Sequence, residues 1–393
     1  MKYPKIFLKP ETFKSKSRHP WIFSKEIAKI KGNIAGGDIA GIFSAEGNFL
    51  GNGYYNPKSN ITVRILSTEN KAIDAEFIAE RINTAFQKRK PLLTKTNAMR
   101  IVFSEADGLA GLILDLYNNV IVFQVASLGM ERLKEYVLSA VKQIIKPRAI
   151  YEKSNDKQRL TEGLAPAVCW HTKEKQPLVD IFEGKIIYRI DLEGGHKTGF
   201  YLDQRTSRMS LKGLVKNKKV LDLFCYTGGF AIAAGVYGAK KVLGIDIKEE
   251  WLKYGHINSG LNEVADTVEF KKAHAFDMLT DIVKGMQRFD VIILDPPSFA
   301  KNKHTLKQAI SGYSELNRLA MYALNTEGIL CTFSCSHHIR AELFAQIIKK
   351  AASMAHKKYA IVKRCHQAQD HHIVKNITES EYLKGYFLKV SPV

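Results

Sequence analysis

The sequence contains little cysteine, and its cysteines follow no pattern. None belongs to a C-x-x-C pair, and the five are scattered at Cys169, Cys225, Cys331, Cys335 and Cys365. This spacing argues against a disulfide framework and against a structural zinc site. The histidines that follow Cys365 match no common ligand spacing either, so we expect no metal.

A long apolar run is also missing. No stretch has the length needed to cross a bilayer, and no basic amphipathic helix is long enough to favour a membrane surface. The first twenty residues hold several lysines and no apolar block longer than Ile6-Phe7-Leu8, which does not resemble a secretory signal. We therefore expect a cytoplasmic protein that does not bind a membrane.

Acidic residues are scarce relative to basic ones. The chain has 59 Lys and Arg against 39 Asp and Glu, a formal net charge of +20, and such an excess attracts polyanions. Nucleic acid is the leading partner. Residues 1–31 are especially basic, and Lys14, Lys16 and Arg18 are candidate contacts to an RNA backbone. A merely solvated charged face is the alternative interpretation.

The length of 393 residues predicts about two to three domains. Short β-type runs separated by turn signals predict a small β-barrel over residues 1–70, the runs being 39–43, 49–51 and 61–66. From Asp74 the apolar period becomes helical, and strands and a second amphipathic helix at 130–144 follow. We interpret residues 73–190 as a separate α+β middle domain.

The stretch 219–246 has the pattern of a strand, a glycine turn, a helix and a second strand. Its first apolar run is continuous, as in a parallel strand that is covered on both faces. Gly228 and Gly229 allow the backbone to turn tightly and to approach a ligand. Asp246 closes the second strand, where an acid can accept hydrogen bonds from both ribose hydroxyls of an adenosine. Because no G-x-G-x-x-G is present, a dinucleotide is disfavoured.

A buried strand at 289–294 ends in Asp295-Pro296-Pro297. Proline removes a backbone donor and fixes its own φ, so the pair terminates the strand and holds Asp295 in a rigid rim. The segment resembles motif IV of methyltransferases that act on nucleobases, in which these residues meet polar atoms of an extruded base. Upstream, Asp277 follows the third strand. It is placed either to meet an adenine amino group or to cap a helix.

The last strand predicted in this part of the chain covers 328–335. Cys331 and Cys335 share one face of it, but only Cys335 falls at the carboxyl end, where ligands bind in open α/β sheets. We therefore expect Cys331 to be a small core residue and Cys335 to be the candidate nucleophile. Cys225, which lies in the glycine turn, is a weaker rival.

A catalytic thiol constrains the substrate. A methyltransferase that acts on an amine or hydroxyl uses an existing lone pair and needs no thiol, whereas C5 of a pyrimidine has no lone pair. A thiolate that adds to C6 of cytosine makes C5 a carbanion-like centre that can attack a sulfonium methyl. Our hypothesis assigns Cys335 to this attack and Asp295 to N3. It does not identify the base that later removes the C5 proton.

The whole chain resembles the bacterial large-subunit (23S) ribosomal RNA cytosine-C5 methyltransferases, which join a PUA module, a small α+β domain and a Rossmann-like class I catalytic domain. The matching segments are RHPWIF, GYYNP, KTGFYLDQR, DLFCYTGGF, ILDPPSF, FSCS and EYLKGYF. The resemblance implies a multidomain α/β fold with the catalytic domain at residues 191–393. It also implies 23S ribosomal RNA as the partner and 5-methylcytosine as the product. One departure is Ser298, where many RNA cytosine-C5 enzymes carry a second cysteine.

The resemblance implies S-adenosylmethionine as the cofactor. The segment KTGFYLDQR is similar to the element that lies over the methionine end of the cofactor, and D-x-F-x-x-x-G-G is similar to motif I of class I methyltransferases. The implied cofactor-binding residues are Lys197, Phe200, Asp222, Phe224, Tyr226, Thr227, Gly228, Gly229, Asp246, Asp277 and Asp295.

Two other functions stay open. A base N-methyltransferase would use Asp295-Pro296-Pro297 without a thiol, and a non-catalytic RNA-binding or assembly factor would retain only the fold. The effect of Cys335→Ala and the binding of S-adenosylmethionine discriminate between these functions. The sequence gives neither the target nucleotide, nor whether naked RNA or an assembly particle is the substrate, nor the oligomeric state, for which a homodimer is one option.

Overall fold

The computed structural model describes residues 3–10, 19–300 and 303–393. The chain forms two compact units. The first comprises residues 1–181, 191–200 and 370–380, and the second comprises residues 182–190, 201–369 and 381–393. Among the described residues, no helix combines the length and apolar character needed to cross a membrane. The three domains expected at 1–70, 73–190 and 191–393 stay a prediction.

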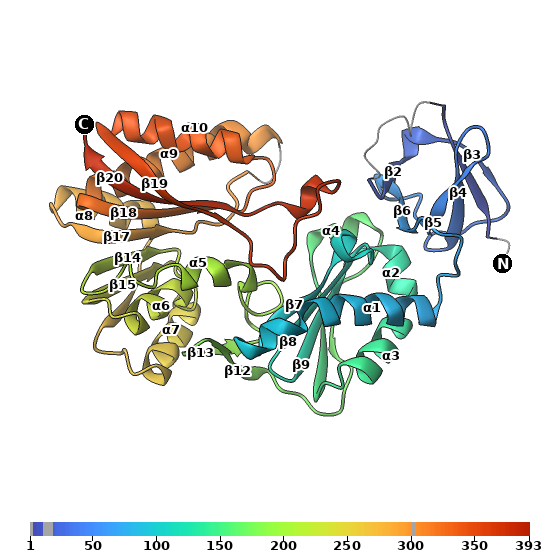
Figure 1. Cartoon of the computed structure of the whole chain (residues 1–393), viewed down its shortest axis with the longest axis horizontal. Coiled ribbons are helices and arrows are strands. Elements are labelled where there is room, and N and C mark those ends of the chain that lie inside the picture. The colour runs from blue at the N-terminus through green and yellow to red at the C-terminus, as the bar shows by residue number, and fades with distance from the viewer. Residues whose placement is uncertain (1–2, 11–18, 301–302) are drawn as a thin grey trace. The chain divides into compact units, whose positions relative to one another are not determined.

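The first unit begins with a six-stranded sheet in the order β2-β6-β5-β4-β1-β3 (Figure 1). Alternate residues point inward, and Ile6, Leu8, Ile22 and Ile42 belong to its small core. The strands are β1 (Lys5–Leu8), β2 (Trp21–Phe23), β3 (Ile27–Lys31), β4 (Ile39–Phe43), β5 (Phe49–Tyr55) and β6 (Ile61–Ser67). The three strands predicted in this region are therefore present, and the second is longer than expected.

A five-stranded sheet in the order β11-β10-β9-β8-β7 follows in the same unit. Its strands are β7 (Ala98–Phe103), β8 (Leu112–Tyr117), β9 (Val120–Val125), β10 (Ala149–Ser154) and β11 (Ala167–Trp170), and the helices are α1 (Ala75–Arg89), α2 (Leu128–Arg132), α3 (Lys134–Ile144) and α4 (Lys157–Thr161). Asp74 caps α1, because its carboxylate accepts a 3.0 Å hydrogen bond from the backbone N–H of Phe77. The single helix expected at 130–144 is interrupted at Leu133, whose ψ of 0° is not helical.

Residues 370–380 belong to this unit although they lie near the end of the chain. The carboxylate of Asp370 accepts a 2.9 Å hydrogen bond from the backbone N–H of Arg100, and its carbonyl oxygen accepts one of 2.9 Å from the side chain of Arg89. These contacts join parts of the sequence that local patterns do not connect.

The second unit contains a seven-stranded sheet in the order β16-β15-β14-β17-β18-β20-β19 (Figure 1). Its strands are β14 (Lys219–Leu223), β15 (Lys241–Asp246), β16 (Val268–Lys272), β17 (Phe289–Leu294), β18 (Leu324–Ser334), β19 (Lys357–His366) and β20 (Lys384–Pro392). The pairs from β16 to β18 are parallel, as the continuous apolar runs predicted. The last strand, β20, lies antiparallel between β18 and β19.

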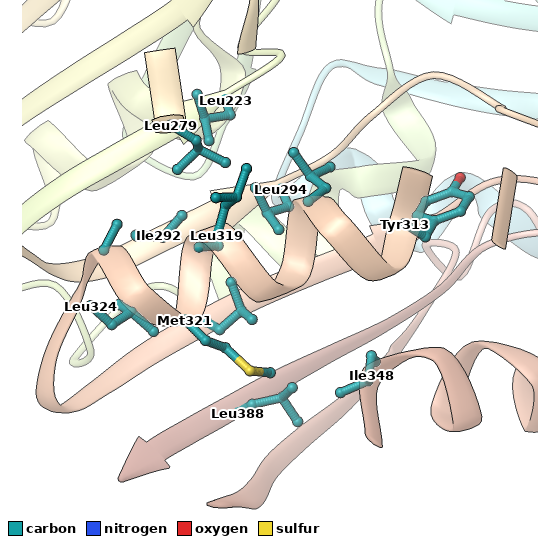
Figure 2. Close-up of a cluster of buried hydrophobic side chains, with 14 of the residues drawn as sticks. Leu223, Leu279, Ile292, Leu294, Tyr313, Leu319, Met321, Leu324, Ile348 and Leu388 are labelled. Atoms are coloured by element: carbon teal, nitrogen blue, oxygen red, sulfur yellow. The ribbon is translucent and has the colours of Figure 1, made fainter. Parts of the chain in front are cut away.

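Helices cover both faces of this sheet (Figure 1). They are α5 (Arg205–Met209), α6 (Gly229–Val236), α7 (Glu249–Leu261), α8 (Ala275–Lys284), α9 (Leu306–Ala323) and α10 (Ala341–Met354). Figure 2 shows the core under α9, where Leu223, Ile292 and Leu294 of the strands meet Leu279 of α8 and Leu319 of α9. This packing fixes the strand ends that carry the motif residues.

A separate two-stranded sheet pairs β12 (Leu178–Glu183) with β13 (Ile186–Asp191). In the described structure, residues 194–205 add no strand to a sheet, and His196 and Gly199 form an isolated antiparallel bridge. The backbone N–H of Phe200 donates instead to the hydroxyl of Tyr117, at 3.1 Å. A side chain therefore takes the place of a partner strand.

Candidate active site

Four parallel strands bring the motif residues to one edge of the sheet. Strands β15, β14, β17 and β18 are neighbours in this order and run in the same direction. Their carboxyl ends therefore meet at one edge, where open α/β sheets bind ligands. Asp246 ends β15, Asp295 follows β17, and Cys335 follows β18.

The turn after β14 has an unusual backbone. Phe224 and Tyr226 have φ angles of 64° and 54°, and Gly228 has a φ of 84°. Positive φ costs a bulky residue of the order of 1–3 kcal/mol and persists where the surrounding structure enforces it, often at functional sites. Space is also limited at Gly228, because an added Cβ would lie 2.7 Å from the ring of Phe270. The predicted glycine turn is therefore tight and leads directly into α6.

Asp222 is buried beneath this turn and organises it. One carboxylate oxygen, Oδ2, accepts a 2.9 Å hydrogen bond from the backbone N–H of Ala231 in the first turn of α6. Burial raises the pKa of Asp222 well above its usual value, and the nearby charges of Asp295 and Asp246 raise it further. Within the described part of the chain, Asp222 Oδ1 and the hydroxyl of Thr227 are buried and have no hydrogen-bond partner.

Asp246 is held by backbone donors. Its carboxylate accepts hydrogen bonds from the N–H of Tyr226 at 2.9 Å and of Lys248 at 3.2 Å. Each carboxylate oxygen has a second lone pair, so ribose hydroxyls can still donate to it. The next residue, Ile247, is a large apolar side chain that is 56% exposed. Ile247 was not predicted as a site residue from the sequence, although it directly follows the acid that closes β15.

Asp277 does not cap a helix. The N-cap of α8 is His274, and Asp277 lies within the first turn. Its side chain is 82% exposed, so the capping alternative is wrong. A contact between Asp277 and an adenine amino group stays a prediction.

Lys197 and Phe200 belong to the first unit, unlike the other expected cofactor ligands. Lys197 is exposed with a φ of 52°, and Phe200 is buried. Between them, the hydroxyl of Thr198 donates to the carboxylate of Asp115 at 2.6 Å. The cofactor-binding roles of Lys197 and Phe200 stay predictions.

The candidate nucleophile lies beside the Asp-Pro-Pro segment. Cys335 is half-buried, and its Sγ is 4.0 Å from the carbonyl oxygen of Pro296. Burial raises the pKa of the Tyr201 and Tyr313 hydroxyls, and the charges of both Asp295 and Cys335 raise the pKa of each further. The carboxyl and the thiol therefore act on the same two hydroxyl groups, which indicates that they share one site.

The other cysteines of the sheet are poorly suited to attack. Cys331 is fully buried, as expected for a core residue, and burial raises the pKa of its thiol well above the ordinary value. Burial likewise raises the pKa of Cys225. A thiol must ionise to act as a nucleophile, so these environments favour Cys335 over Cys225.

A pocket of about 440 Å³ lies against the Asp-Pro-Pro loop, lined by residues that include Phe276, Pro297, Phe299 and Gly312. Pro297 is exposed, whereas Pro296 is buried. A second hollow of about 800 Å³ contains Lys219 and Lys241 at the amino ends of β14 and β15, the opposite edge from the motif residues. The first pocket therefore borders the Asp-Pro-Pro segment through Pro297.

The predicted RNA contacts and the potential metal ligands lie away from this edge of the sheet or outside the described residues. Lys14, Lys16 and Arg18 lie outside the described residues. Among the described residues, one group with metal-ligand chemistry is present, formed by Glu152, Cys169 and His171. Lys134 already pairs with Glu152 at 3.2 Å, so a cation there would have to displace an ammonium group.

Comparisons with known proteins agree with this geometry. A family model described as S-adenosylmethionine-dependent methyltransferase matches residues 157–359, and a PUA-like domain model matches residues 6–68. The ribosomal RNA large subunit methyltransferase I of Tolumonas auensis is 39% identical and covers 95% of both chains. The protein of the same name from Alteromonas mediterranea is 37% identical and covers 98% of both.

The chain belongs to this methyltransferase family. It has a PUA-like domain followed by a class I methyltransferase domain, and its cofactor is S-adenosylmethionine, which confirms the fold and the cofactor expected from the sequence. The fold of this methyltransferase is shared with SMU.776, solved in complex with SAH, with a TM-score of 0.84, 22% identity and coverage of 99% and 100%. Trm5b from Pyrococcus abyssi is more distant, with a TM-score of 0.52, 18% identity and coverage of 71% and 74%.

The residues of this methyltransferase fit the cofactor. The buried, unpartnered oxygens of Asp222 and Thr227 offer hydrogen-bond acceptors, and buried polar groups normally have partners. The tight turn at Gly228 lets a ligand approach the backbone, and Asp246 stands at the adjacent strand end. A bound adenosine and its sulfonium chain would satisfy groups that the protein alone leaves unpaired.

Proposed function

We propose that this protein transfers a methyl group to C5 of a cytosine in large-subunit (23S) ribosomal RNA. The names of the relatives support large-subunit ribosomal RNA as the substrate class. The net charge of +20 supports a polyanionic partner, and a PUA-like domain at residues 6–68 agrees with an RNA substrate.

The observation that carries the proposal is the position of Cys335. Its half-buried thiol stands one residue beyond β18 and 4.0 Å from the carbonyl oxygen of Pro296, beyond the neighbouring strand β17. An N-methyltransferase needs no nucleophile, because the target nitrogen carries its own lone pair. A thiol at this position therefore favours a carbon target.

In the proposed reaction the thiolate of Cys335 attacks C6 of the extruded cytosine. An S–C6 bond forms, the C5=C6 π electrons move to C5, and the protonated carboxyl group of Asp295 donates its proton to N3, which N3 returns when the thiolate leaves. The electron pair at C5 would form a C5–CH3 bond with the methyl group that S-adenosylmethionine supplies when bound, the sulfonium S–CH3 bond would break, and S-adenosylhomocysteine would be the leaving group. A base then removes the C5 proton, the C–H electron pair restores C5=C6, and the thiolate leaves.

Covalent trapping tests the thiol directly. In RNA containing 5-fluorocytidine, C5 carries fluorine in place of the proton that must be removed, so the adduct persists. We expect a denaturant-resistant protein–RNA complex with the natural protein and with Cys169→Ala, which removes an exposed cysteine. Cys335→Ala should give no complex. A complex with Cys335→Ala, or unchanged methylation by it, contradicts the C5 proposal.

Mass spectrometry of nucleosides identifies the product. Large-subunit ribosomal RNA from cells lacking the gene should lose one 5-methylcytidine, and the natural gene should restore it whereas a Cys335→Ala gene should not. Loss of a methylguanosine or methyladenosine instead would favour base N-methylation. If no modification is lost and calorimetry detects no S-adenosylmethionine binding, a non-catalytic assembly factor is favoured.

A further inference from the structure

The strand β20 places a buried lysine against the turn that carries the thiol. Lys384 is the first residue of β20 and lies opposite Ser334, the last residue of β18, in the antiparallel register. Cys335 follows Ser334 directly. The side chain of Lys384 is 5% exposed. From the sequence, its segment EYLKGYF contributed only to the family resemblance.

The ammonium group of Lys384 is held by two backbone carbonyl groups. It donates hydrogen bonds to the carbonyl oxygen of Ser336 at 2.7 Å and to that of Tyr382 at 2.8 Å. An ammonium has three donors, so these bonds leave one N–H. The bond to Ser336 ties β20 to the residue directly after Cys335.

The surroundings of Cys335 contain both a carboxyl group and a cation. Asp295 acts on the same tyrosine hydroxyls as Cys335, and a nearby carboxylate opposes ionisation of a thiol. Tyr201 and Tyr313 are held neutral by burial. Lys384 interacts electrostatically with Cys335 and with Glu381. Lys384 therefore supplies the positive charge that opposes these groups.

We propose that Lys384 is a positioning residue that fixes the turn bearing Cys335 and stabilises its thiolate. This inference rests on the proposed function of Cys335 as the nucleophile. A cation next to a cysteine lowers the pH at which the thiolate forms. Burial lowers the pKa of Lys384 to about 8, and the charges of Cys335 and Glu381 oppose this shift. Near neutral pH the group is therefore still mostly protonated.

The pH dependence of Cys335 alkylation tests this role. Iodoacetamide labelling in a Cys169→Ser background, resolved by peptide fragmentation, reports the thiolate of Cys335. Lys384→Gln keeps a donor but removes the charge, and we expect the labelling midpoint to rise by about one pH unit or more. Lys384→Arg should keep the midpoint low. Lys389→Met is the matched control, because Lys389 lies on the same strand but is half exposed and pairs with Glu327.

An unchanged midpoint in folded Lys384→Gln overturns the inference. If this variant does not fold, Lys384→Met decides, since it also removes the charge while keeping an unbranched side chain, and the same rise of the midpoint is expected. The labelling does not require methyl transfer, so the two proposals fail separately. A shifted labelling midpoint in Lys384→Gln, together with methyl transfer by Cys335→Ala, would contradict only the C5 proposal. An unshifted labelling midpoint in Lys384→Gln, together with no methyl transfer by Cys335→Ala, would contradict only the role of Lys384.

A second inference concerns the outer face of the N-terminal sheet. Strand β1 directs Ile6 and Leu8 inward, and β4 directs Ile42 inward. By the alternation of strand residues, their neighbours point outward. The register places Phe7 opposite both Phe43 and Lys29, and Lys5 opposite Lys31.

These outward residues form a lysine–phenylalanine platform, which we define as Lys5, Phe7, Lys29, Lys31 and Phe43. The two rings stack with centroids 5.4 Å apart and an interplanar angle of 27°. Lys5 lies 5.1 Å over the ring of Phe43, whereas Lys29 and Lys31 lie 5.2 and 5.4 Å from the centroid of Phe7. All three lysines are exposed and both rings are half-buried.

We infer that the platform binds single-stranded RNA of the substrate, which rests on the proposed function. Single-strand binding surfaces combine aromatic rings on which bases stack with cations that follow the phosphates. Phe7 and Phe43 supply the rings, and the three lysines supply the cations. The positive charge of the platform complements RNA.

Fluorescence anisotropy with the full chain and a labelled single strand of about 12 nucleotides tests the platform. Lys5→Gln/Lys29→Gln/Lys31→Gln should weaken binding and reduce the slope of log affinity against log salt by about two. Phe7→Ala/Phe43→Ala should weaken binding by about tenfold or more without changing the slope. The control is Lys173→Gln/Lys175→Gln, two exposed lysines outside the platform.

Unchanged RNA affinity in both platform variants overturns the second inference. So does an equal loss in the Lys173/Lys175 control, or a preference of the platform for anionic vesicles over RNA. Cys335→Ala should bind the strand normally. The result therefore does not depend on whether the methylated atom is C5.

Discussion

Asp222 illustrates how a single buried residue serves both the fold and the ligand. One carboxylate oxygen accepts a bond from the N–H of Ala231, while the other has no partner in the described structure. The pKa of Asp222 is raised by burial and then by the charges of Asp295 and Asp246. An acid whose folded-state pKa is raised stabilises the fold fully at low pH, and this contribution is lost as pH rises through the folded-state pKa.

The variant Asp222→Asn tests this linkage, because an amide cannot ionise and can still accept the bond from Ala231. In the ligand-free protein, the free energy of unfolding of the natural chain should fall relative to Asp222→Asn as pH rises above about 4, by at most about 1.4 kcal/mol per unit. Urea unfolding at several pH values measures the difference. A pH-independent difference would contradict the raised pKa. Calorimetry should also show weaker S-adenosylmethionine binding by Asp222→Asn.

The roles of the two cysteines on β18 could be predicted from the place where the strand ends. The end of β18 falls between Cys331 and Cys335, so strand position alone separated the core cysteine from the one at the edge. The prediction failed for the capping role of Asp277, because helix α8 starts earlier than expected. Lys384 was missed as a site residue, because its proximity to Cys335 depends on the pairing of strands 50 positions apart.

At the scale of elements, local patterns correctly predicted the strand, turn, helix and strand of 219–246. Strand β20, which lies antiparallel between β18 and β19, was not predicted from the sequence. The order of strands depends on long-range pairing, which apolar alternation does not encode. The conformation of residues 198–200 also depends on distant parts of the sequence. Tyr117 and Asp115, which lie far away in sequence, take up the polar groups of this segment.

The turn between β14 and α6 allows a prediction about stability. Gly228→Ala places a Cβ 2.7 Å from the Phe270 ring at a φ of 84°. We expect a loss of about 2–4 kcal/mol in the free energy of unfolding, since the left-handed conformation costs about 1–2 kcal/mol and overpacking adds a comparable amount. Gly260→Ala is the matched control, because nothing lies within 4 Å of its added Cβ in α7. This control should gain up to about 1 kcal/mol.

Denaturant unfolding measures both glycine variants. A loss of less than about 0.5 kcal/mol in Gly228→Ala would mean that the turn relaxes easily and is not held in its strained form. Cofactor affinity should fall in Gly228→Ala and stay unchanged in Gly260→Ala.

At the scale of the whole molecule, the two units have separate hydrophobic cores. The cluster containing Leu223, Ile292 and Leu319 belongs to the second unit, whereas the clusters around Ile82 and Ile42 belong to the first. Proteins with more than one such body often unfold in more than one step. Asp222, Thr227, Gly228 and Asp246 all lie in the second unit, so a ligand that they hold should stabilise this unit.

Differential scanning calorimetry with and without S-adenosylhomocysteine tests this expectation. We expect two transitions, of which one shifts upward on saturation, by about 2.7 kcal/mol of added stability at a ligand concentration of one hundred times Kd. Asp246→Ala should abolish most of the shift, because it removes the acceptor expected for the ribose. A shift of both transitions would mean that the ligand also engages the first unit, to which Lys197 and Phe200 belong. No shift at saturating ligand would contradict the cofactor site at the turn.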